Sequence, residues 1–185
     1  RRRPCREGAS VHGVVQRILR ARFGILAGAP EETVQESFRA AVTEALGDHR
    51  VSEFLYFLGA YLDLHYPESP FATALDDDPT QFARVSQAVL RRFFEADAKT
   101  HPTILTFEDV HAAQDDSLEL VDYLIRSLRD APILIVVVAR PELLARRADW
   151  TDTDNHHRIE LGPLTPDDSA SLMYHLLEPL QDVPE

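Results

Sequence analysis

Two adjacent carboxylates follow a short apolar run in the second half of the chain. Residues 103–107 form the run, and Glu108 and Asp109 come directly after it. Such a run is typical of a strand covered on both faces, so the two acids are expected at its carboxyl end. One carboxylate can hold a hydrated magnesium ion through water, while the other polarises an attacking water. The pair therefore predicts a magnesium-nucleotide site.

An arginine follows the next apolar run along the chain. Residues 133–138 form this second run, Arg140 stands two positions after it, and a helical pattern lies between the two runs. Strand, helix and strand in this order predict a right-handed parallel crossover, which brings both carboxyl ends to one edge of a sheet. The planar fork of an arginine matches phosphate oxygens. We therefore expect Glu108, Asp109 and Arg140 to converge at that edge, where they would serve nucleotide hydrolysis or nucleotide sensing.

Helices are expected to fill the first half of the chain and to support these strands. Apolar residues recur there at helical spacing, and Gly24 and Gly47 end two of the patterns. The four predicted helices begin near Ser10, Pro30 (as the first helical residue), Val51 and Pro79, and the third extends to about Leu64.

The second half adds shorter elements. Asp116 and Glu119 have the spacing of a capping box and are expected to open the helix between the two strands. Residues 159–161 are a candidate third strand, and Thr165 is placed to cap a last helix. The predicted fold class is a helix-rich α/β fold with a parallel sheet.

Composition excludes several classes of protein. The chain has 185 residues, is 44% hydrophobic and 27% charged, and has a net charge of −12. A domain this acidic is a poor direct binder of nucleic acid, which requires clustered lysine and arginine. The single cysteine, Cys5, excludes a disulfide framework and fits the cytoplasm. Because we find neither a signal peptide nor an apolar run of transmembrane length, no membrane association is expected.

Two other polar groups do not predict metal sites. The consecutive acids 76–78 lie in a loop, where such residues are usually solvated or cap the next helix. His156 and His157 lack a second pair of ligands at usable spacing.

Several motifs resemble those of the signal-transduction ATPases with numerous domains (STAND ATPases), a branch of the P-loop NTPases. The closest resemblance is to the AAA-like ATPase modules found beside bacterial serine/threonine kinase, nucleotide cyclase or transcription-regulator domains. The matching motifs are residues 3–8, Leu105-Thr106-Phe107-Glu108-Asp109-Val110-His111, Asp115-Asp116-Ser117-Leu118, Arg140-Pro141-Glu142-Leu143 and residues 161–166.

The resemblance implies roles for three residues. Glu108 would be the Walker B acid that holds Mg²⁺ through water, and Asp109 would be a second metal-site acid and the general base. Arg140 would be the catalytic sensor that contacts the γ-phosphate of ATP. The family often has Trp-Ala-Asp after the histidine, and residues 112–115 depart from this, so we interpret His111 as an orienting or structural side chain rather than a chemical one.

One required motif is missing from the sequence. No Gly-x-x-x-x-Gly-Lys followed by Ser or Thr occurs, and such a Walker A loop cradles phosphates through backbone amides and a lysine. We therefore expect a fragment whose partial parallel sheet, of the P-loop NTPase (AAA-like) type, lacks its phosphate-loop strand. This stretch alone is predicted to be inactive, because ATP and Mg²⁺ would bind only with the missing segment.

The expected organisation follows from the resemblance. Residues 1–163 would be an incomplete AAA/STAND-type core, with a helical insert over about 10–98 and the Walker B to sensor unit over 102–143. Residues 164–185 would begin a following helical subdomain.

Three functions are compatible with these observations. The first is a fragment of an ATP-binding, ATP-hydrolysing regulatory switch in a multidomain signalling or transcription regulator, whose partners are ATP and the other domains of the same polypeptide. The second is a nucleotide-fold interaction or scaffold module without catalysis. The third is an AAA-type DNA-transaction ATPase, which the acidic balance disfavours. The sequence leaves homo-oligomerisation open.

Overall fold

The computed structural model describes residues 11–26, 28–47, 50–66, 69–71, 78–151 and 155–178. The chain divides into two units, Arg1–Thr153 and Asp154–Glu185, and each is described by itself. The expectations for residues 3–8, Cys5 and Ser10 fall outside the described residues.

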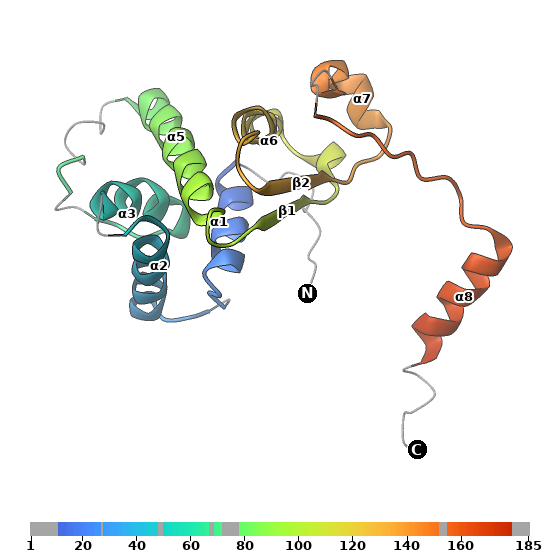
Figure 1. The fold of residues 1–185 in the computed structure, drawn as a ribbon, viewed down its shortest axis with the longest axis horizontal. Coiled ribbons are helices and arrows are strands. Elements are labelled where there is room, and N and C mark those ends of the chain that lie inside the picture. The colour runs from blue at the N-terminus through green and yellow to red at the C-terminus, as the bar shows by residue number, and fades with distance from the viewer. Residues whose placement is uncertain are drawn as a thin grey trace. The chain divides into compact units, whose positions relative to one another are not determined.

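Helices make up the first part of the larger unit (Figure 1). They are α1 (Val11–Arg22), α2 (Glu31–Leu46), α3 (Val51–Gly59), the 3₁₀ turn η1 (Ala60–Leu62) and α5 (Pro79–Asp97). The third predicted helix therefore ends earlier than expected as an α-helix and continues as a 3₁₀ turn. Aromatic rings fill the space between these helices, and Phe38, Phe57 and Phe93 are almost completely buried.

The start of α5 illustrates how the sequence sets a helix end. The Asp78 carboxylate accepts a hydrogen bond from the backbone N–H of Gln81 at 2.9 Å, and Pro79 occupies the first turn. Asp78 thus caps a helix, as consecutive acids on a loop often do. Pro30 is the cap residue of α2 rather than its first helical residue, because its ψ of 147° is extended.

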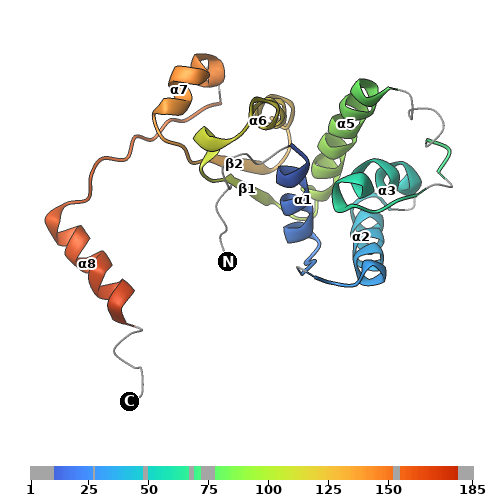
Figure 2. The ribbon, with the colours of Figure 1, turned by 180° about the vertical axis from the view of Figure 1, so that it is seen from behind.

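Two parallel strands follow the helices. Strand β1 (Thr103–Phe107) pairs in register with β2 (Ile133–Val137), and α6 (Asp115–Ser127) connects them. The predicted strand, helix and strand order is confirmed, and so is the helix-rich α/β class. Figures 1 and 2 show α1 and α6 beside the strand pair, with α2, α3 and α5 grouped farther along the unit.

The expectation that the first strand is covered on both faces is wrong. Leu105 and Phe107 are buried in the hydrophobic core, which also includes residues of α1 and α6. On the opposite face, Ile104 is 66% exposed, and on β2 Leu134 is 58% exposed. Period-two alternation puts successive side chains on opposite faces, and among the described residues helices pack on one of these faces.

The start of α6 also differs from the sequence prediction. Gln114 is the cap residue, with no side-chain cap hydrogen bond, and the helix begins at Asp115. Asp116 is therefore the second residue of the helix, two positions past the cap residue. Its carboxylate accepts instead from the backbone N–H of Ser117 at 2.7 Å.

Short helical elements follow each strand. They are η2 (Val110–Ala112) after β1, and α7 (Glu142–Arg146) and η3 (Ala148–Thr151) after β2. Leu143 of α7 and Trp150 of η3 are buried.

The smaller unit contains α8 (Pro166–Leu177). The Thr165 hydroxyl accepts a hydrogen bond from the Asp168 N–H at 3.1 Å, which confirms the predicted cap. Residues 159–161 form no strand, and Ile159 and Leu161 are exposed. None of the described helices in either unit combines the length and apolar character needed to cross a membrane. The predicted functional boundary after residue 163 stays a prediction.

Candidate functional site at the strand ends

The carboxyl ends of β1 and β2 lie side by side. Phe107 pairs with Val137 in the parallel register. Backbone hydrogen bonds continue beyond the strands, from Val138 N–H to the Phe107 carbonyl at 2.8 Å and from Val110 N–H to the Val138 carbonyl at 3.2 Å. The segment that carries Glu108 and Asp109 and the segment that carries Arg140 therefore leave the sheet at the same edge.

Asp109 turns the chain sharply after β1. Its backbone is left-handed, with φ of 54° and ψ of 35°, a conformation that is uncommon outside glycine and that aspartate tolerates better than most residues. The turn buries the next residue, Val110, at 2% exposure. Glu108 and Asp109 themselves stay half-buried at the end of the strand. Strained backbone of this kind costs about 1–2 kcal/mol and often marks a functional site.

The two acids and the arginine are available to a ligand. Among the described residues, no hydrogen bond or ion pair engages the side chains of Glu108, Asp109 or Arg140. Arg140 is exposed. Mg²⁺ in proteins typically binds one or two carboxylates and keeps several water ligands. The half-buried carboxylates of Glu108 and Asp109 fit that number of protein ligands. In the part of the chain that the structure describes, no group of three or more His, Cys, Asp or Glu side chains could hold a metal by itself.

His111 connects the two strand ends. Its Nδ1 accepts a hydrogen bond from the backbone N–H of Arg140 at 3.4 Å, near the long limit for such a bond. The contact agrees with the interpretation of His111 as an orienting side chain.

Arg146 is not among the site residues predicted from the sequence. Its guanidinium donates to the His111 carbonyl at 2.9 Å, to the Ala113 carbonyl at 3.3 Å and to the Asp115 carboxylate at 2.6 Å. These partners lie 31 to 35 residues away along the chain. No local pattern could have indicated them, although an arginine soon after a predicted site strand was a signal to weigh.

Comparison with known proteins places the chain in a family. Residues 1–137 match the AAA ATPase domain family, which is most of the chain. The chain belongs to the AAA ATPase domain family. Such domains typically bind ATP with Mg²⁺. The matched region of this AAA ATPase domain contains Glu108 and Asp109 and ends three residues before Arg140.

A curated relative is known as well. The chain is 29% identical over 94 residues to an uncharacterized protein of Rhizobium meliloti (strain 1021). The match covers 51% of this chain and 9% of that protein, so the chain spans a small part of its relative's length. No solved structure matches the chain.

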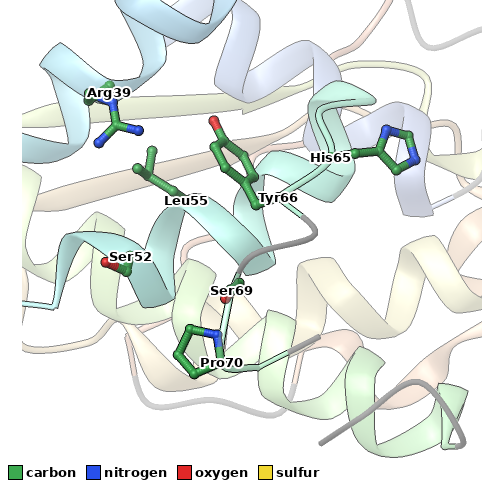
Figure 3. Close-up of a pocket in the computed structure, with 7 residues that line it drawn as sticks. All are labelled: Arg39, Ser52, Leu55, His65, Tyr66, Ser69 and Pro70. Atoms are coloured by element: carbon green, nitrogen blue, oxygen red, sulfur yellow. The ribbon is translucent and has the colours of Figure 1, made fainter. Parts of the chain in front are cut away.

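The AAA ATPase domain also has an open cavity of about 530 Å³ in its helical part. Figure 3 shows the residues that line it, which come from α2, α3 and the segment after η1: Arg39, Ser52, Leu55, His65, Tyr66, Ser69 and Pro70. Neither the acidic pair nor Arg140 is among them, so this cavity is separate from the strand-end site.

Of the other polar groups considered from the sequence, Asp78 has a structural role. Asp76 and Asp77 lie outside the described residues, and Asp78 caps α5. His156 and His157 are exposed residues of the smaller unit.

Proposed function

We propose that this chain supplies the metal-binding and phosphate-sensing part of an ATP-hydrolysing regulatory switch. The observation that carries the proposal is the parallel pairing of β1 and β2, which brings the segments bearing the acidic pair and Arg140 to one edge. Membership of the AAA ATPase domain family supports nucleotide binding at that edge.

Each residue has a distinct role in the proposal. Glu108 holds the metal through its water shell, and Asp109 accepts a proton from the attacking water or orients it. Arg140 donates to oxygens of the terminal phosphate, where negative charge develops during phosphoryl transfer. Bound Mg²⁺ would supply charge neutralisation on the phosphate oxygens.

ATP binding also needs a phosphate cradle. The 185 residues contain no Walker A motif, so the proposal concerns the full-length gene product that includes this chain. The relative from Rhizobium meliloti, of which the match covers only 9%, supports a multidomain setting. In that setting, ATP binding would shift the domain between two arrangements and slow hydrolysis would reset it.

The test compares ATP binding and phosphate release by the full-length gene product and its Glu108→Gln variant. We expect Glu108→Gln to lower the phosphate release rate by about 100-fold, the scale at which a single transition-state contact acts. The variant should still bind ATP. Glu119→Gln, which changes an exposed glutamate on α6, is the matched control and should retain the wild-type rate.

Two outcomes would redirect the proposal. Binding of ATP by the wild type without phosphate release would favour the non-catalytic interaction or scaffold module. Equal release by the wild type and Glu108→Gln would remove the metal role from Glu108.

A further inference from the structure

We propose that Arg146 is a positioning residue that fixes the loop carrying Asp109 relative to Arg140. The proposal rests on the proposed function, because it assigns Arg146 a task in keeping that site in its working geometry. Arg146 itself touches neither of the two acids, so its effect would pass through the backbone.

The loop after β1 has little regular structure of its own. It contains the three-residue turn η2, and its internal backbone bonds run from Ala112 N–H to the Asp109 carbonyl at 2.9 Å and from Ala113 N–H to the Val110 carbonyl at 3.1 Å. Asp109 also stays in the left-handed region, which persists only when the surrounding structure enforces it. The loop therefore needs an external tie to hold one conformation.

Arg146 provides that tie from the other strand's side. It is the last residue of α7, the helix that follows β2 and Arg140. One nitrogen, Nη1, donates to the carbonyls of His111 and Ala113, and the other, Nη2, donates to the Ala113 carbonyl and the Asp115 carboxylate. A planar fork with fixed donors holds several acceptors in one arrangement better than a flexible ammonium does.

The helix that carries Arg146 is itself held in place. Leu143 of α7 is 4% exposed, and Trp150 of the following turn is 6% exposed. The side chain of Arg146 therefore starts from a packed element. A second contact, from the Arg140 N–H to Nδ1 of His111, ties the same loop to the start of α7. Together the two contacts close a ring that runs from the end of β1 through η2 and α7 to the end of β2.

The simplest alternative is that Arg146 is a surface arginine in a weak ion pair. Such pairs contribute little when both partners are exposed, and Asp115 is 78% exposed. The two backbone carbonyls distinguish Arg146 from that case. Arg126 offers a direct comparison, because its side chain is also 41% exposed and it pairs with Asp122 four residues away on the same helix.

The experiment uses the full-length gene product with Arg146→Ala, Arg146→Lys and the matched control Arg126→Ala. We measure ATP affinity, phosphate release under saturating ATP, thermal unfolding, and amide hydrogen exchange of residues 108–115 without nucleotide. Misplacement of catalytic groups by about 1 Å can cost about 100-fold in rate. We expect Arg146→Ala to lower kcat by about 10- to 100-fold with ATP affinity within about twofold of the wild type. Arg146→Lys should recover part of the rate, and Arg126→Ala should retain it.

Hydrogen exchange separates this proposal from the proposed function. Arg146→Ala should speed exchange in residues 108–115 at least about tenfold more than in β1, since the loop loses its tie while the strand pairing remains. Unchanged exchange there would overturn the positioning role, whether or not the protein hydrolyses ATP. A wild type that hydrolyses ATP, together with Arg146→Ala at the wild-type kcat, would overturn it as well. If instead the wild type releases no phosphate, the proposed function fails. The exchange result alone then decides whether Arg146 holds the loop in place.

Discussion

The helical region and the strand pair of the larger unit bury their apolar residues to different extents. Phe38 and Phe93 in the helical region are completely buried between helices. The strand pair is covered on one face, while Ile104 and Leu134 remain exposed on the other. The helical region should therefore contribute most of the free energy of unfolding. The strand pair should mainly position Glu108, Asp109 and Arg140. Four substitutions or conditions test this comparison, and a fifth measurement tests the site.

The largest effect should come from Phe93→Ala in the helical region. The Phe93 ring is fully buried and contacts the Phe23 ring edge-on, with centroids 5.5 Å apart. Removal of a buried phenyl ring leaves a cavity and should lower the free energy of unfolding by about 3–5 kcal/mol. Urea unfolding measures the change. Leu134→Ala on the exposed sheet face is the control, and an equal loss there would contradict the comparison.

A smaller loss should follow from Asp97→Asn. The Asp97 carboxylate, 1% exposed, accepts two hydrogen bonds at 2.6 Å from the Arg22 guanidinium. This bidentate pair joins α1 to α5. Disruption of a buried pair costs about 3–5 kcal/mol, and because Arg22 is 25% exposed we expect about 2–3 kcal/mol.

The exposed pair between Arg126 and Asp122 gives the control for that measurement. Asp122→Asn should change the free energy of unfolding by less than about 1 kcal/mol, because Arg126 is 41% exposed and Asp122, at 20%, is less buried than Asp97. If both substitutions cost the same in urea unfolding, burial would not be what makes the Arg22–Asp97 pair matter.

Alkaline pH should weaken the helical region selectively. Burial raises the pKa of Tyr61, and the neighbouring Ser86 hydroxyl acts in the opposite direction. The folded state thus favours the neutral phenol. Its contribution to stability is complete below the unfolded pKa of about 10 and is lost as pH rises through the higher folded pKa. Urea unfolding between pH 8 and pH 11 should show stability falling above about pH 10, and less steeply in Tyr61→Phe. An identical fall in the variant would exclude Tyr61 as a cause.

The smallest effect should come from the exposed face of β1. Ile104→Ser should change the free energy of unfolding by no more than about 0.5 kcal/mol, as surface substitutions usually do. It should also raise solubility, since it interrupts an apolar surface. Leu105→Ser, one residue along and 7% exposed, should cost more than about 2 kcal/mol. Similar costs at both positions would mean that this face is covered in solution.

The sequence predicted the elements with strong local signals. Helical spacing of apolar residues and capping residues identified α5 and α8, and apolar runs identified both strands. These signals are local, because Asp78 and Thr165 cap the helices that directly follow them. Adjacency of the two strand ends followed from the parallel order. Two local predictions, the cap at Asp116 and the helical start at Pro30, missed by one or two residues. The larger failures depended on residues far away in the sequence. The uncovered sheet face reflects which helices pack there, and the bonds of Arg146 reach more than thirty residues back. The chemical roles of Glu108, Asp109 and Arg140 stay predictions.

A double-mutant cycle between the two strand ends tests the proposed site most directly. Phosphate release by the full-length gene product is measured for the wild type, Asp109→Asn, Arg140→Ala and the double variant. Residues that act in one transition state lose rate non-additively. We expect each single change to slow release by about 100-fold and the double variant to be little slower than either. A double variant slowed by the product of the two single effects would contradict a shared site. A wild-type rate in either single variant would contradict it as well.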